Sequence, residues 1–163
     1  MRVDQIAPDP PIPSVPPAPP PSSATARKVM LGNRSESAIE RILRSELHRR
    51  GLRFRKHLSP VPGLRCKLDV AFPRQRLAVF VDGCFWHRCP IHGSEPKANA
   101  AWWKTKLDAN VARDRRNDRA LREAGWTVLR LWAHVPIDDM AKEVSALLSA
   151  CKANRPTATK PRV

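Results

Sequence analysis

Cysteine and histidine residues in the second half of the chain have the types and spacing of a metal site. Cys84, Cys89 and His92 lie within a stretch of nine residues, and His134 or Cys151 could supply a fourth ligand. Zn²⁺ prefers thiolates and imidazoles, and four protein ligands are typical of structural sites. The set predicts a zinc ion that pins this loop, with His134 as the expected fourth ligand. Free thiols and surface imidazoles are the alternative.

Carboxylates and a further histidine around the same stretch could carry out hydrolysis. Asp69 is expected inside a strand, and Val81 and Asp82 end the neighbouring strand, so a carboxylate and main-chain carbonyls could converge at one sheet edge. Oxygen ligands of this kind hold Mg²⁺ beside a phosphate. The imidazole of His87 could then take the proton from an attacking water, unless it replaces His92 as a zinc ligand. A salt-bridged pair of acids facing arginines is the alternative.

Phe85 and Trp86 place two large rings in the same polar loop. A loop pinned by a metal gives little room to bury both rings in the core of the domain. Apolar side chains of this size can be inserted between base pairs, where added contact offsets the cost of unstacking. The pair is therefore a candidate wedge for DNA, with core packing of one ring as the alternative.

Hydrophobic periodicity predicts the elements that must position these residues. A helix begins at the capping-box sequence Ser37-Ala-Ile-Glu40 and stops at Gly51, which gives Glu40 a structural role as a capping acid. Alternating and apolar runs predict strands, and helical spacing predicts two further helices. The expected strands are 52–56, 67–72, 77–81 and 126–132, and the later helices are 99–123 and 138–150. The order αβββαβα predicts an α/β fold with a mixed sheet flanked by helices.

Asp114 is unusual within the longest of these helices. Trp103, Leu107 and Val111 recur on one helical face, and Asp114 falls on the same face. A carboxylate that points toward the core costs several kcal/mol unless it is paired or bound to a metal. The position of Asp114 therefore requires a partner.

The composition indicates a nucleic acid as partner. Lys and Arg number 30 against 15 Asp and Glu, so the formal charge is +15 and the pI is near 11.0. A merely soluble basic surface is the alternative. The chain has no apolar run as long as a membrane span and no signal-peptide layout, so we expect a cytoplasmic protein with reduced cysteines.

Three regions are expected along the 163 residues. Residues 1–28 hold nine of the 17 prolines, which predicts an extended, disordered tail that could tether a partner or be a mere extension. Residues 29–151 form the single expected domain. The basic residues 152–163 predict a flexible C-terminal tail.

Three segments of the chain resemble those of a known family. Val79-Phe-Val-Asp-Gly-Cys-Phe-Trp-His87, Ala112-Arg-Asp-Arg-Arg116 and Gly125-Trp-Thr-Val-Leu-Arg-Leu-Trp132 are similar to the very short patch repair endonucleases, and the resemblance covers residues 28–150. It implies a restriction-endonuclease-like fold and an enzyme that nicks one DNA strand 5′ to the thymine of a T·G mismatch, where a methylated cytosine has deaminated. It also implies a bacterial, nucleoid-associated monomer that acts on double-stranded DNA, with other mismatch-repair proteins as further partners.

The resemblance also implies a role for each candidate residue. Asp69 matches the central Mg²⁺ ligand, aided by the main-chain carbonyl of Val81, and His87 matches the general base. Further positions assist catalysis, bind the structural Zn²⁺ or intercalate into DNA. The assisting positions are Glu40 and Asp114, the zinc positions are Cys84, Cys89, His92 and His134, and the intercalating positions are Phe85, Trp86 and Met30.

Two departures from the family pattern concern the metal sites. The best-known members have Thr-His where this chain has Val81-Asp82, so the carbonyl survives but the histidine does not, and Asp82 is left to bind metal or orient a neighbour. The zinc set has two cysteines and two histidines rather than three and one. These changes bear on sequence preference more than on nuclease chemistry. The alternatives are a related nuclease without mismatch preference and a catalytically silent zinc-containing DNA-binding protein.

Overall fold

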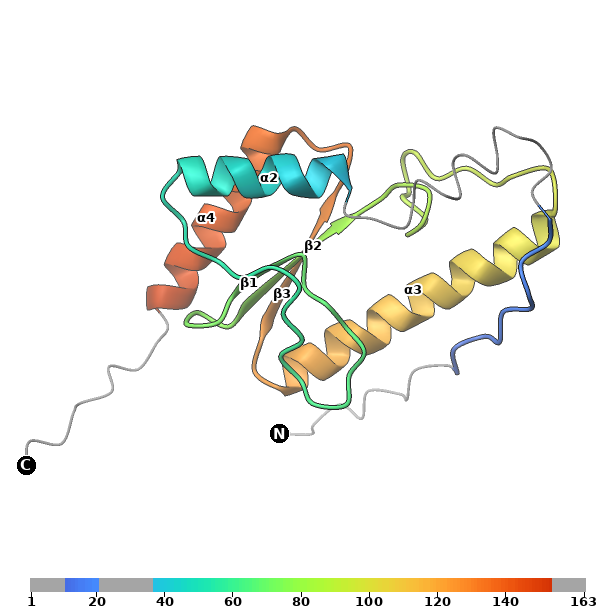
Figure 1. Ribbon diagram of the computed structural model, residues 1–163, viewed down its shortest axis with the longest axis horizontal. Helices are drawn as coiled ribbons and strands as arrows, with labels where there is room; N and C mark the ends of the chain where they lie inside the picture. The colour runs from blue at the N-terminus through green and yellow to red at the C-terminus, as the bar shows by residue number, and fades with distance from the viewer. Residues whose placement is uncertain (1–10, 21–36, 154–163) are drawn as a thin grey trace, which may run out of the picture.

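Figure 1 shows the computed structural model, in which residues 11–20 and 37–153 are described. Met30, a candidate intercalating residue, lies outside these ranges. The elements in chain order are α2 (Ala38–Arg49), β1 (Val70–Phe72), β2 (Leu77–Asp82), α3 (Ala100–Glu123), β3 (Thr127–Trp132) and α4 (Ile137–Ala153). The strand β1 pairs antiparallel with β2, and β2 pairs in parallel with β3. The predicted mixed sheet is confirmed.

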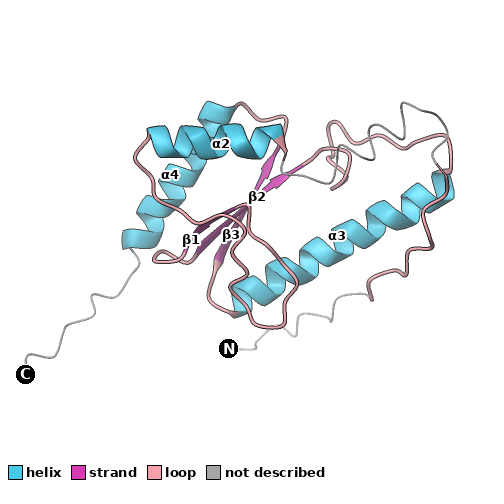
Figure 2. Ribbon diagram, in the orientation of Figure 1, coloured by secondary structure: helices cyan, strands magenta, loops and turns pink. Residues whose placement is uncertain are grey.

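The central strand β2 separates two apolar layers, and every one of its residues is buried. Val79 and Val81 belong to the layer that includes α2 and α4, whereas Ala78 and Phe80 belong to the layer under α3. Figure 2 shows α2 and α4 on one side of the sheet and α3 on the other. Because side chains alternate along a strand, Asp82 lies on the α3 side.

The helix α2 begins at the predicted capping box. The Ser37 hydroxyl accepts a hydrogen bond from the Glu40 N–H at 3.2 Å, and Glu40 Oε1 accepts one from the Ser37 N–H at 3.3 Å. Gly51, with a φ of 74°, follows the end of the helix, where residues with a side chain would be strained. The cap fixes the Glu40 carboxylate at the N-terminal end of α2.

The strand expected at 52–56 does not form. Arg55 makes an isolated bridge to Ala71 and Leu58 makes another to Leu68, and the left-handed φ of 54° at His57 between them interrupts regular strand pairing. The strand β1 is shorter than expected, and Asp69 lies in a bend just before it. The observed order is therefore αββαβα.

The other expected helices and strands form close to their predicted positions. Within the described ranges, no helix combines the length and the apolar character needed to cross a membrane. Residues 11–20, for which we expected disorder, lie along α3, and Trp102 donates a hydrogen bond to the carbonyl oxygen of Pro16. The expected domain boundaries stay predictions.

Candidate functional site

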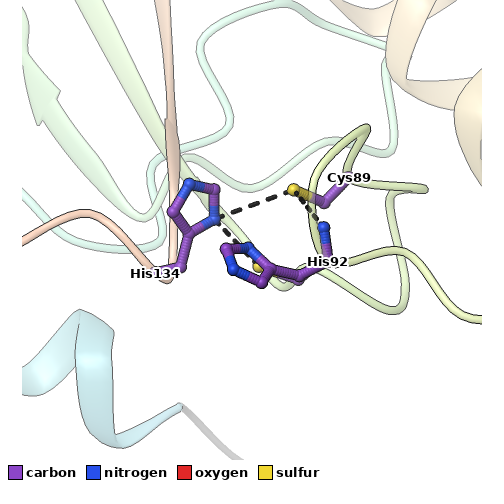
Figure 3. A group of neighbouring side chains, drawn as sticks. Cys89, His92 and His134 are labelled. Carbon is purple, nitrogen blue, oxygen red and sulfur yellow. Dashed lines mark hydrogen bonds between the residues drawn. The ribbon is translucent and has the colours of Figure 1, made fainter.

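The four expected zinc ligands come together where β2 and β3 end. The ligand atoms of Cys84, Cys89, His92 and His134 lie within 4.8 Å of one another, and Cys84 Sγ is 3.2 Å from His134 Nδ1. Figure 3 shows His92 and His134 beside the Cys89 sulfur, which lies 3.7 Å from His134 Nδ1. Neighbouring ligand atoms in a tetrahedral zinc site are separated by about 3.5 Å. The donor types and their spacing therefore fit Zn²⁺.

Strand pairing brings His134 to a loop that lies much earlier in the chain. The strands β2 and β3 pair in parallel with Asp82 opposite Trp132, so the segments that follow both strands emerge side by side. The loop itself turns tightly, with the Gly93 N–H donating to the Cys89 carbonyl at 2.7 Å. A Cβ at position 93 would lie 2.5 Å from that carbonyl oxygen, so only glycine fits this turn.

The remaining cysteines are not part of this cluster. Cys151 Sγ lies 3.8 Å from the hydroxyl of Thr127 at the start of β3, whereas His134 follows its end. Cys66 lies in the apolar layer under α3, and burial raises the pKa of its thiol to about 11. Of the two candidates for the fourth position, the structure therefore places His134 in the cluster.

His87 faces Asp114 of α3 rather than the cysteines. Its Nδ1 lies 2.6 Å from Asp114 Oδ2. Because an ionised carboxylate can only accept, Nδ1 carries the proton and Nε2 keeps its lone pair. Burial acts to lower the pKa of His87, but the hydrogen bond to Asp114 and the charge of Asp82 outweigh it and raise the pKa. The pair has the form of an oriented general base.

Arg130 of β3, which the sequence analysis missed, organises the acids around His87. Its Nη1 donates to both carboxylate oxygens of Asp82 at 2.7 and 2.9 Å, and its Nε donates to Asp118 at 3.1 Å. Its Nη2 lies 3.4 Å from Asp114 Oδ1. Asp82 Oδ1 in turn lies 3.7 Å from His87 Nδ1. Arg130 thus holds Asp82 and Asp114, and both acids flank the imidazole.

Asp69 lies beside Val81 at the end of the sheet. Its Oδ2 accepts a hydrogen bond from the Val81 N–H at 2.8 Å. Burial raises the pKa of Asp69 to about 6, reinforced by the charges of Glu40 and Asp82 and opposed by that hydrogen bond and by the charge of Arg44. Arg44 donates to the main-chain oxygen of Asp69 at 3.1 Å and lies 3.7 Å from Glu40 Oε2. A half-buried carboxylate whose pKa is raised suits a divalent cation.

Arg44 and Arg130 carry the same kind of signal in the sequence. Arg44 follows Glu40 by one helical turn on a face that the helix buries, and Arg130 stands between Leu129 and Leu131 in the middle of a strand. A basic residue in such a place requires an acidic partner when it is buried. A search for those partners in the sequence would have linked both arginines to the candidate site.

Phe85 and Trp86 pack against α3. Their ring centroids lie 5.2 and 5.8 Å from that of Trp103, and 5.1 Å from each other. Trp102 extends the group, with its ring 4.8 Å from Trp103. Asn110 Nδ2 donates to the main-chain oxygen of Trp86 at 3.2 Å and so ties the loop to the helix. All four rings are half-buried, which leaves part of a large aromatic surface accessible.

The sequence of this chain is similar to those of several known proteins. A sequence model of the family described as "DNA mismatch endonuclease Vsr" matches residues 22–92. The chain is 41% identical over 125 residues to type II nicking enzyme V.NaeI of Lentzea aerocolonigenes, which covers 76% of this chain and 75% of that one. It is 45% identical over 95 residues to type II nicking enzyme V.XorIIP of Xanthomonas oryzae pv. oryzae, and this match covers 57% of this chain and 67% of that enzyme. It is 37% identical over 99 residues to DNA mismatch endonuclease Vsr of Escherichia coli, and this match covers 60% of this chain and 61% of that enzyme.

Proposed function

The chain belongs to the family of Vsr DNA mismatch endonucleases, and on that premise we propose that it nicks one DNA strand 5′ to the thymine of a T·G mismatch left by deamination of 5-methylcytosine. The observation that carries this proposal is the 2.6 Å contact between His87 and Asp114, beside the acids at the end of the sheet. Hydrolysis of a phosphodiester needs a base for the attacking water and a cation that neutralises charge on the phosphate. The formal charge of +15 favours DNA as the substrate.

The cation in this proposal is Mg²⁺, held by the Asp69 carboxylate and the main-chain carbonyl of Val81. Glu40 lies near enough for its charge to raise the pKa of Asp69, so it assists the same site. A bound Mg²⁺ would neutralise the charge that develops on the phosphate and would favour hydroxide over water. The raised pKa of Asp69 supports the assignment, because a divalent cation would relieve the crowding of negative charge.

The base in this proposal is His87. Its Nε2 accepts the proton of the attacking water, and Asp114 stabilises the imidazolium that results. Both carboxylate oxygens of Asp82 accept hydrogen bonds from Arg130. We therefore assign Asp82 the role of positioning His87 and not that of a metal ligand.

Phe85 and Trp86 are the proposed wedge for DNA, together with Met30 from outside the described residues. Their packing on Trp103 presents the two rings as one unit. Insertion between base pairs costs a few kcal/mol of unstacking, and a mismatched pair costs less to open than a matched one. This difference would favour T·G over T·A.

The four ligands Cys84, Cys89, His92 and His134 hold a structural Zn²⁺ in this proposal. The purified chain should contain one zinc ion per molecule by elemental analysis. Cys84→Ser should lose the metal and lower the thermal midpoint, because the loop that carries His87 is then no longer pinned. Cys151→Ser is the matched control, since that thiol lies at the other end of β3, and it should keep its zinc. Equal zinc content in both variants would contradict the ligand set.

The decisive experiment compares labelled T·G and T·A duplexes with and without Mg²⁺. The chain should nick the T·G duplex only when Mg²⁺ is present. Asp69→Ala should lower the nicking rate by roughly a thousandfold or more, because the metal and its charge stabilisation are lost. Asp139→Ala removes an exposed acid of α4 and should nick normally. Metal-dependent nicking by Asp69→Ala at the normal rate would refute the assignment.

Two other outcomes identify the alternatives. Equal nicking of T·A and T·G would indicate a nuclease without mismatch preference. Salt-sensitive binding without nicking at any metal concentration would indicate a silent DNA-binding protein.

A further inference from the structure

The proline-rich segment 11–20 runs beside α3, where Figure 1 draws it in blue next to the helix. The Trp102 indole N–H donates to the Pro16 carbonyl at 3.0 Å. Further along the helix, Pro11 and Pro13 share a hollow of about 350 Å³ with residues of α3 that include Val111. The contact therefore extends along the helix and is not confined to one hydrogen bond.

The composition of this segment suits it to such a contact. Six of its ten residues are proline, which fixes φ and favours an extended polyproline helix without internal hydrogen bonds. Such a chain loses little conformational entropy on binding and offers its carbonyl groups to donors, indole N–H groups among them. Ile12 and Val15 are half-buried, while Pro13 and Ser14 between them are exposed. Pro19 is half-buried as well, so the half-buried side chains recur every three to four residues along the segment.

The first turns of α3, where Trp102 contacts the segment, are supported by the loop that carries Phe85 and Trp86 and by a hydrogen bond from Arg88 to the Lys104 carbonyl, and not by the core. No residue from Ala100 to Lys106 is buried, and Figure 1 shows this end of the helix reaching beyond the sheet. The helix also begins at Asn99 without a hydrogen bond from a capping side chain. A helix end with few buried contacts frays readily. Trp102 and Trp103 lie in this stretch, and Trp103 carries the rings of Phe85 and Trp86.

We propose that residues 11–20 bind the outer face of α3 within the same chain, as a polyproline ligand. In this position they brace the aromatic cluster formed by Phe85, Trp86, Trp102 and Trp103, which means that they keep its rings and the start of α3 ordered. The brace acts through Trp102, which contacts the segment through its indole nitrogen and Trp103 through its ring. The bracing is a property of the free chain and does not depend on the proposed nicking activity.

A consequence for DNA rests on the proposed function. A wedge that is ordered before DNA binds has less entropy to lose on insertion. The segment 11–20 carries no charge, so its detachment should weaken binding to a T·G duplex without changing the salt dependence. Loss of a contact to a DNA phosphate would instead change both the affinity and its salt dependence.

Hydrogen exchange in the full-length chain tests the brace. Ile12→Ser/Val15→Ser should speed exchange of the backbone amides from Trp103 to Leu107 by roughly threefold or more, while amides of β2 stay unchanged. Pro17→Ser/Ala18→Ser changes two exposed residues of the same segment and is the matched control. Unchanged exchange in the Ile12/Val15 variant would overturn the proposal.

Two further measurements separate docking from bracing. Trp102→Phe keeps the ring but removes the donor to Pro16, and it should speed exchange in the same amides by a smaller factor. A peptide of residues 8–21, added at millimolar concentration to the Ile12/Val15 variant, should restore slow exchange, whereas a scrambled peptide should not.

A peptide that binds without slowing exchange would refute the brace. Asp69→Ala should leave all these rates unchanged even where nicking is lost, so failure of the brace and failure of the proposed function are distinguishable.

Discussion

Asp69, which is half-buried, and Asp82, which is buried, lie at the same end of the sheet, but positive charge compensates them to different degrees. Both oxygens of Asp82 accept from Arg130, whereas the Asp69 carboxylate accepts from the Val81 N–H, and Arg44 donates to the main-chain oxygen of Asp69 while its charge acts to lower the pKa of that acid. Burial raises the pKa of both acids, to about 6 for Asp69. An acid already held by a guanidinium is suited to positioning, and one short of positive charge is suited to a metal.

Removal of the compensating cation should produce the largest change. Arg130→Met should lower the free energy of unfolding by about 3 kcal/mol, because the buried carboxylates of Asp82 and Asp118 then lose the guanidinium that donates hydrogen bonds to both. Urea denaturation at neutral pH measures the loss. Arg122→Met is the matched control, since Arg122 also reaches Asp118 but is mostly exposed, and it should change the free energy little. A loss no larger than that of the control would mean that Asp82 is no better compensated than Asp69.

Removal of the less compensated acid, Asp69, should instead raise the free energy of unfolding. Asp69→Asn keeps an acceptor for the Val81 N–H but removes the charge of a half-buried carboxylate, so it should stabilise the metal-free chain by about 2 kcal/mol above pH 6. The pKa of Asp69 is higher in the folded chain than in the unfolded chain, so the wild-type chain loses stability as the pH rises from about 4 to about 6. The advantage of Asp69→Asn should therefore vanish below pH 4.

Thermal melts across this pH range, with EDTA present, measure the effect of Asp69→Asn. Excess Mg²⁺ should reduce the advantage of the variant, because only the wild-type chain gains from binding the ion. A variant that is less stable than wild type at pH 7 would show that Asp69 is already compensated.

Removal of the charge of Asp82, which positions His87, should have the smallest effect of the three changes. Asp82→Asn should lower the nicking rate about tenfold or less, because the imidazole keeps its closer partner, Asp114. Asp82 raises the pKa of His87, so the acidic limb of the pH–rate profile should move to lower pH in this variant. Asp118→Asn is the matched control, since Asp118 also contacts Arg130 but does not contact His87. This variant should leave the pH–rate profile unchanged. A complete loss of nicking in Asp82→Asn would instead favour a metal-binding role.

Local patterns were sufficient to predict several parts of the molecule. The capping box of α2 and the buried run of β2 formed as expected, since both depend on neighbours close in the chain. The placement of Asp114 on an apolar helical face correctly indicated a partner, which is His87. These features could be predicted because helical and strand periods determine which side chains share a face.

Other parts depend on contacts that the sequence does not specify. The strand expected at 52–56 has an alternating pattern, but the left-handed residue His57 interrupts the pairing and leaves only isolated bridges at Arg55 and Leu58. Arg130 resembles an outward-facing residue of an alternating strand, and only the pairing with Phe80 places its guanidinium over that ring, 4.6 Å away, on the α3 side. The docking of residues 11–20 on α3 also requires the tertiary structure, because polyproline carries no period that identifies its partner.

The parallel pairing of β2 and β3 also restricts how the length of this chain can vary. A single residue inserted into β3 would turn Arg130 toward α4, because side chains alternate along a strand. The same insertion would displace His134 relative to the cysteines, so one change of length would disrupt the acids and the thiol cluster together. The residues after Gly93 and before α3 carry neither group of ligands and are exposed for the most part. We therefore expect relatives of this chain to differ in length in that loop and to keep both strands free of insertions.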